Sequence, residues 1–295
     1  MASIVDPQVI MRLSSTPLAA RLAMLGHMSG RHKSPHRGSS VEFAEYRKYV
    51  PGDDTRRVDW RVYGRSDRFY IKEFEADTNL RLCLILDTSG SMAFGSGELT
   101  KWDYAKRLAA TLAYLAIQQG DAAGLYAGGP KLHCAIPPSR RPTHLMALND
   151  ALEGMTPMAE TGLTDHLHQL AEEIPQRALV ILISDLLDLP DKIIDCWQHL
   201  RFRHHDVAVF HVQDREEVTF DLSQSFRFVD LEGDEAIIAE PQVIQERYRA
   251  AVLRHQAALR EGVAQCQVDY HEVLTDEDYE QALVRFLTQR LGMQG

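Results

Sequence analysis

The sequence predicts an α/β protein with a doubly wound, mostly parallel sheet, an N-terminal arm and a small β-containing extension. Two observations lead to this fold class. Short apolar runs recur along the chain and end at acidic or polar residues, as in strands that are buried on both faces of a parallel sheet. Between these runs lie amphipathic segments of helical length, and strands that alternate with helices build doubly wound sheets.

The apolar runs and the helical segments can be placed along the chain. The predicted strands are Leu82–Leu86, which ends at Asp87, Ala178–Ile183, which ends at Ser184-Asp185, Val207–Val212, which ends near Asp214, and Val268–Leu274. The predicted helices span residues 102–119, 143–152, 165–174, 193–203, 241–264 and 278–291. Further upstream, Arg68–Glu75 has the aromatic and β-branched content of a strand.

The chain is predicted to have two parts. Residues 1–79 form an N-terminal arm, which begins with helical spacing over Pro7–Met28 and continues through a loop rich in Gly, Ser, Pro and His. Residues 80–295 form the sheet domain. With 295 residues and 45% hydrophobic content, the chain is long enough to bury a full core.

Composition and charge predict a cytoplasmic protein without a membrane span. Asp6, Arg12 and Arg21 interrupt every apolar stretch in the first thirty residues, so neither a signal peptide nor a spanning helix fits. The cysteines form no CxxC pair and are expected to be reduced core residues, namely Cys83, Cys134, Cys196 and Cys266.

Residues 31–68 are basic although the whole chain has a net charge of −10. This segment holds ten Lys and Arg against six Asp and Glu. It could dock a partner, bind nucleic acid, or form a solvated face with internal salt bridges. The interspersed acids favour the solvated face, and the acidic total disfavours nonspecific binding of nucleic acid.

Polar residues that directly follow buried strands are the first candidates for a site, because ligands bind beyond the carboxyl ends of parallel strands. Asp87-Thr88-Ser89-Gly90-Ser91 forms a D-x-S-x-S turn after the first strand, and Asp185 follows another. Hydroxyls with a few carboxylates suit Mg²⁺, and Mn²⁺ or Ca²⁺ are alternatives. Such a ligand set carries few protein charges, so the metal would still attract a carboxylate from a partner.

This spacing resembles the metal-ion-dependent adhesion site (MIDAS) of the von Willebrand factor A domain family, over roughly residues 80–290. The resemblance implies that Thr164, in Thr161-Gly162-Leu163-Thr164-Asp165, and Asp185 complete a metal site with Asp87, Ser89 and Ser91. Thr161 is an alternative ligand, and Thr164 could instead cap the following helix. The sequence departs from the family pattern at Leu163 and at Leu186, where glycine is usual.

Residues 38–60, from Gly38-Ser39-Ser40 through Tyr49-Val50-Pro51-Gly52-Asp53-Asp54 to Val58-Asp59-Trp60, resemble the signature of the domain of unknown function 58 family. Members of that bacterial family join this segment to a von Willebrand A-like domain and are associated with MoxR-type AAA+ ATPases. The resemblance implies a non-enzymatic, chaperone-like adaptor. Its partner would be such an ATPase or the client of that ATPase, held through an acidic side chain at the metal.

Two other functions compete with this hypothesis. A metal-dependent hydrolase or phosphotransferase would use Asp87 as its nucleophile. However, a second Asp two residues later is absent, and so are a phosphate-binding loop and a Gly-x-Ser-x-Gly elbow. A nucleic-acid binder would use the basic segment, but no known nucleic-acid-binding motif accompanies it.

Overall fold

The computed structural model describes residues 4–20, 42–48, 60–66, 69–75, 80–128, 132–158, 162–174, 177–221, 226–229, 231, 236–239 and 241–292. The chain divides into two compact units. One unit joins Met1–Arg21 to Arg81–Gly295, and the other comprises Leu22–Leu80. All five predicted metal ligands belong to the first unit.

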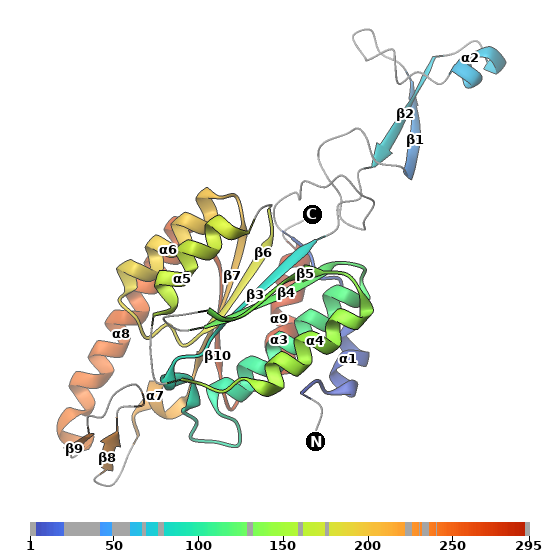
Figure 1. The fold of residues 1–295 in the computed structure, drawn as a ribbon. Helices are drawn as coiled ribbons and strands as arrows, with labels where there is room; N and C mark the ends of the chain where they lie inside the picture. The colour runs from blue at the N-terminus through green and yellow to red at the C-terminus, as the bar shows by residue number, and fades with distance from the viewer. Residues whose placement is uncertain are drawn as a thin grey trace. The chain divides into compact units, whose positions relative to one another are not determined.

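A six-stranded sheet forms the centre of the first unit (Figure 1). Its strands are β3 (Arg81–Asp87), β4 (Ala122–Gly128), β5 (Leu132–Ser139), β6 (Leu179–Ser184), β7 (Asp206–Gln213) and β10 (Asp269–Leu274). They lie in the order β10-β7-β6-β3-β4-β5, and β5 is the one strand of this sheet that runs antiparallel to its neighbour. The chain therefore builds outward from β3 in both directions, which confirms the predicted mostly parallel α/β sheet.

Helices cover both faces of this sheet (Figure 1). On one face lie α5 (Leu163–Glu173), α6 (Pro190–Phe202) and α8 (Pro241–Cys266), with α6 in contact with both of the others. On the other face lie α1 (Pro7–Leu13), α3 (Lys101–Gln118), α4 (Pro142–Gly154) and α9 (Tyr279–Gly292), and α3 contacts all three neighbours. Shorter elements are the 3₁₀ helix η2 (Gly90–Ala93), α7 (Arg215–Thr219) and the hairpin of β8 (Phe226–Val229) with β9 (Ala236–Ala239).

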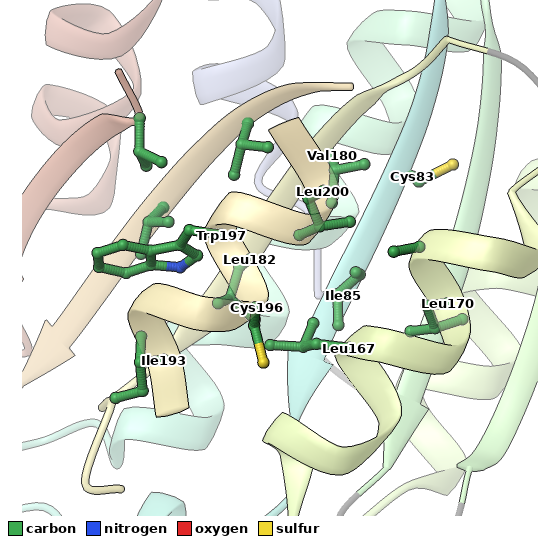
Figure 2. Close-up of a cluster of buried hydrophobic side chains, with 14 of the residues drawn as sticks. Cys83, Ile85, Leu167, Leu170, Val180, Leu182, Ile193, Cys196, Trp197 and Leu200 are labelled. Atoms are coloured by element: carbon green, nitrogen blue, oxygen red, sulfur yellow. The ribbon is translucent and has the colours of Figure 1, made fainter. Parts of the chain in front are cut away.

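A hydrophobic cluster holds α5 and α6 against the sheet (Figure 2). Its fully buried members include residues of β3 (Cys83, Ile85), β6 (Val180, Leu182), α5 (Leu167, Leu170) and α6 (Trp197, Leu200). Full burial of one large apolar side chain contributes roughly 1.5–3 kcal/mol. Because α5 and α6 begin beside the carboxyl ends of these strands, the cluster also determines where their first residues lie.

Arg290 explains why the N-terminal residues belong to the sheet unit. This arginine of α9 is fully buried, and its guanidinium pairs with Asp269 at 2.9 Å and with Asp206. Its Nε donates a hydrogen bond to the carbonyl oxygen of Ala19 at 2.6 Å. A buried charge is tolerated only when its donors are satisfied. The N-terminal segment is therefore tied to the starts of β7 and β10.

Strands β4 and β5 were not predicted from the sequence. The composition of β4 is Ala-Ala-Gly-Leu-Tyr-Ala-Gly, and alanine and glycine are poor indicators of a strand. A Cβ at Gly124 would lie 2.7 Å from the carbonyl oxygen of Ile136 and 2.8 Å from Cδ of Pro138. Glycine is therefore required for the pairing with β5. Prolines 137 and 138 are accommodated in β5 because it is an edge strand.

Helix α1 is shorter than the spacing over Pro7–Met28 predicts. It ends at Leu13, and the backbone N–H of Thr16 bonds to the carbonyl of Leu13 in a closing turn. Pro17 then has no N–H with which to continue a helix. Residues 21–28 of the predicted helix lie outside the described residues.

The second unit contains a two-stranded antiparallel sheet of β1 (Glu42–Lys48) and β2 (Tyr70–Glu75), and helix α2 (Trp60–Ser66), which lies between them in the sequence. Strand β2 confirms the strand predicted at Arg68–Glu75. Of the signature segment, residues 38–41 and 49–59 lie outside the described residues.

The prediction that all four cysteines lie in the core is correct for three of them: Cys83, Cys196 and Cys266 are buried, whereas Cys134 on the edge strand β5 is half-buried. All four cysteines are free thiols. Within the described part of the chain, no helix combines the length and the apolar content needed to cross a membrane.

Leu186 adopts a left-handed backbone conformation with φ 54°, which costs a non-glycine residue about 1–2 kcal/mol. Its side chain is buried in the hydrophobic cluster, and truncation of a buried leucine costs about 2–5 kcal/mol. We therefore expect Leu186→Gly to lower the free energy of unfolding by about 2–4 kcal/mol, because the lost burial outweighs the relieved strain, which the backbone entropy of the new glycine largely cancels. Urea denaturation measures this change.

His204→Gly is the matched control. His204 also has a positive φ, of 64°, but its side chain is exposed. Strain relief and the entropy of the new glycine nearly cancel there, so the free energy of unfolding should change by less than about 1 kcal/mol. Equal losses in the two variants would contradict this account of Leu186.

Candidate functional site

The predicted site lies where the winding of the sheet changes direction. Strands β3 and β6 are parallel neighbours, with Leu86 opposite Ile183. The next residues along these strands are Asp87 and Ser184, and Asp185 follows directly. Ligands of doubly wound proteins bind at such a switch point, outside the carboxyl ends of the strands. The two predicted carboxylates therefore leave adjacent strands at the same edge.

One pocket brings all five predicted ligands together. Its lining includes Asp87, Ser89, Ser91, Thr164 and Asp185. Leu163, Ser184 and Asp188 also line it. Thr161, the alternative ligand, lies outside the described residues. Residues from two strand ends and one helix start thus face a common space, as the sequence predicted.

The turn after β3 is held by hydrogen bonds to Asp87. The backbone N–H of Ser89 donates to Oδ1 of Asp87 at 2.9 Å, and the hydroxyl of Ser184 donates to Oδ2 at 2.6 Å. The Oγ atoms of Ser89 and Ser91 lie 3.0 Å apart, at the start of η2. Both Asp87 oxygens therefore have a fixed donor, and the two serine hydroxyls meet at one side of the pocket.

Burial and a neighbouring carboxylate perturb Asp87. Burial raises its pKa, and the nearby charge of Asp185 raises it further. Hydrogen bonds from Ser184 and Ser89 oppose these effects, and the resulting pKa is about 6. A cation in the pocket would stabilise the ionised form of Asp87 and so offset the cost of burying its charge.

Asp185 is paired with a buried lysine. Nζ of Lys101, the first residue of α3, lies 2.7 Å from Oδ2 of Asp185 and 2.6 Å from Oε1 of Glu217. Burial acts to lower the pKa of Lys101, but the two carboxylates outweigh it and the pKa is raised. The lysine is therefore an ammonium ion that holds Asp185 in place from the side of α3.

Thr164 does not cap α5, because it is the second residue of that helix and Gly162 occupies the cap. Gly162 has φ 144°, which an L-residue rarely adopts. The hydroxyl of Thr164 donates to Oδ2 of Asp188 at 2.7 Å. Asp188 was not predicted from the sequence. The one signal for it there is an acidic residue three positions after Asp185.

The surroundings of the site hold more charge than the sequence predicted. Asp188 adds a third carboxylate to the pocket lining, and Lys101 with Glu217 lies directly behind Asp185. The sequence predicted a charge-poor set of five ligands, and the side chains that contact these five residues carry additional charge.

The donor set fits a hard divalent cation. Neighbouring ligand oxygens around octahedral Mg²⁺, at bond lengths of 2.0–2.1 Å, lie about 2.9–3.0 Å apart. The two serine oxygens have this spacing already, which is also that of an ordinary hydrogen bond. Among the described residues, no group of three or more His, Cys, Asp or Glu is arranged to hold a metal. A metal here would therefore depend on hydroxyl as well as carboxylate oxygens.

Comparison with known proteins identifies a family, relatives of similar sequence and solved structures with a similar fold. The family described as protein of unknown function DUF58 matches residues 45–258. Uncharacterized protein Rv1480 of Mycobacterium tuberculosis H37Rv is 26% identical over 97% of this chain and 90% of its own length.

Two solved structures share the fold. They are conserved hypothetical protein BatB from Bacteroides thetaiotaomicron and an aerotolerance-related membrane protein from Bacteroides fragilis. The identities are 14% and 15%, and the TM-scores are 0.51 and 0.50. Each match covers 72% of this chain, and 100% and 99% of the respective structures. At these identities the similarity concerns the fold alone.

The raised pKa of Asp87 predicts a pH-dependent effect of Asp87→Asn. Between pH 3.8 and about 6 the folded chain binds more protons than the unfolded chain, so stability is lost as the pH rises through 6. Asparagine does not ionise and avoids this loss. In EDTA, the stability of the variant relative to wild type should therefore rise by about 1–3 kcal/mol between pH 4 and pH 8, in addition to a pH-independent cost for the hydrogen bond that the amide NH₂ cannot accept. Urea denaturation at several pH values measures it.

The exposed carboxylate of Asp195, in the middle of α6, provides the control. As an exposed substitution, Asp195→Asn should change the free energy of unfolding by less than about 0.5 kcal/mol. A stability difference for Asp87→Asn that stays constant from pH 4 to pH 8 would contradict the assigned ionisation of Asp87.

Proposed function

The chain belongs to the DUF58 family of proteins of unknown function, and we propose that it is a metal-dependent protein-binding adaptor. Its doubly wound sheet would be of the von Willebrand factor A type, with a MIDAS-type site at the switch point. The observation that carries the proposal is the single pocket lined by all five predicted ligands, namely Asp87, Ser89, Ser91, Thr164 and Asp185.

Five side chains would hold Mg²⁺, with Mn²⁺ or Ca²⁺ as alternatives. Ser89, Ser91 and Thr164 contribute neutral hydroxyl oxygens, and Asp87 and Asp185 contribute carboxylates. When bound, the cation supplies the positive charge that attracts an acidic side chain of a partner. The chain's part is to orient these oxygens beforehand, through Ser184 on Asp87 and Lys101 on Asp185.

The local geometry favours binding over catalysis. Asp87, the nucleophile of an alternative hydrolase or phosphotransferase, is buried, and both of its oxygens accept hydrogen bonds. Each of these hydrogen bonds uses one lone pair and draws electron density from the carboxylate, which makes Asp87 a weaker nucleophile. The second lone pair of each oxygen remains free to ligate a cation. We therefore propose a non-enzymatic role.

The family resemblance supplies the proposed partner. A MoxR-type AAA+ ATPase, or the client protein of such an ATPase, would present the acidic side chain to the metal. The complex would form in the cytoplasm and serve protein assembly or chaperone-like remodelling. Nucleic acid is not part of the proposal.

Removal of two ligand hydroxyls should weaken both Mg²⁺ binding and metal-dependent partner binding. We expect the double variant Ser89→Ala, Ser91→Ala to bind Mg²⁺ at least about 10-fold more weakly, because even indirect support of a ligand contributes that much. Isothermal titration with MgCl₂ measures the affinity. A pull-down with a purified MoxR-type ATPase from the same organism should recover less partner with the variant, and less with wild type in EDTA.

The double variant Ser14→Ala, Ser15→Ala is the matched control, because both serines lie just after α1 and outside the pocket lining. It should bind Mg²⁺ and partner like wild type. Undiminished partner recovery with both the pocket variant and EDTA would reject metal-mediated docking. Absence of Mg²⁺ binding by wild type would reject the metal site itself.

A further inference from the structure

Asp188 lies in the short connection between β6 and α6, and it lines the pocket. Leu186 in this connection has a positive φ, and α6 starts two residues after Asp188. On either side of Asp188, Leu187 and Leu189 are 59% and 63% exposed. The side chains of Leu187 and Leu189 therefore face solvent, whereas the carboxylate of Asp188 points toward Thr164.

Helix capping does not account for Asp188. The N-cap of α6 is Leu189, and no side chain caps this helix. Oδ1 of Asp188 accepts the N–H of the adjacent Leu189 at 2.7 Å, and Oδ2 accepts the hydroxyl of Thr164. Its long-range hydrogen bond therefore goes to a predicted metal ligand on another helix, 24 positions earlier in the chain.

The direction of this hydrogen bond matters for metal binding. A threonine hydroxyl has one proton and two lone pairs, and only a lone pair can ligate a cation. The Thr164 hydroxyl donates its hydrogen bond to Asp188, so both of its lone pairs point away from Asp188 and remain free to ligate a cation. Outer partners of this kind orient ligands and increase their basicity in metal sites.

We propose that Asp188 is a positioning residue that holds the Thr164 hydroxyl in the orientation required to ligate the metal. This inference rests on the proposed function, because it needs a cation in the pocket. Asp188 acts through Thr164 and does not itself contact the cation.

Mn²⁺ binding to the full chain tests the proposal. Asp188→Ala should weaken Mn²⁺ binding about 10–100-fold, as is typical for the loss of an outer partner. Asp188→Asn should keep most of the affinity, because the amide oxygen can accept the same proton. Electron paramagnetic resonance of free Mn²⁺ measures the dissociation constants. Asp188→Leu, similar in size and without an acceptor, replaces the alanine variant if that variant does not fold.

A double-mutant cycle shows whether Asp188 acts through Thr164. Thr164→Val should weaken Mn²⁺ binding by itself, and Asp188→Ala should add little in that background. Water-proton relaxation of the bound Mn²⁺ should report one additional coordinated water in either single variant, in the place of Thr164.

The outcomes separate this proposal from the metal site itself. Equal losses in Asp188→Asn and Asp188→Ala would assign Asp188 a direct ligand or purely charge-based role, and would overturn the positioning role. Additive losses with Thr164→Val would overturn it as well, and so would unchanged Mn²⁺ affinity in Asp188→Ala. If wild type binds neither Mn²⁺ nor Mg²⁺, the proposed function fails and this inference fails with it.

Discussion

The parallel pairing of β3 with β6 is the constraint on which the rest of the site depends. Leu82–Leu86 and Leu179–Ile183 are buried on both faces of the sheet, so a slip of one residue would exchange every side chain between the two helical layers. The register of this strand pair is therefore strongly specified. The same register makes Asp87 and Asp185 leave the sheet side by side. The hydrophobic core thus places two carboxylates where they repel each other.

The protein offsets this repulsion with groups that come from other elements. Lys101 occupies the first turn of α3, where the helix dipole disfavours a cation, and it is fully buried. The ion pairs of Lys101 with Asp185 and Glu217 offset both the unfavourable helix dipole and the cost of burying the ammonium group. One of these, Glu217, also completes the capping box of α7 with Asp214. The ammonium is therefore held by a rigid helix terminus as well as by the site.

The sequence predicts much of this arrangement because its signals are local. Long β-branched and leucine runs identify β3, β6 and β7, and a polar residue after such a run identifies Asp87 and Asp185. Strand β4 carries no such signal, because Gly124 is selected by its close approach to β5 and not by β propensity. Lys101 and Asp188 are missed for a similar reason. Each contacts a residue that lies far away in sequence, so no spacing could reveal the contact.

Three of the predicted metal ligands are each oriented by a neighbouring side chain that is not itself a predicted ligand. Asp87 is oriented by Ser184, Asp185 by Lys101, and Thr164 by Asp188. A site in which each ligand already has a partner needs little rearrangement when a cation arrives. The cost then falls on the cation-free protein, which must bury close carboxylates and hold Leu186 in a strained conformation. A binding site that is prepared in advance is therefore expected to reduce the stability of the fold that carries it.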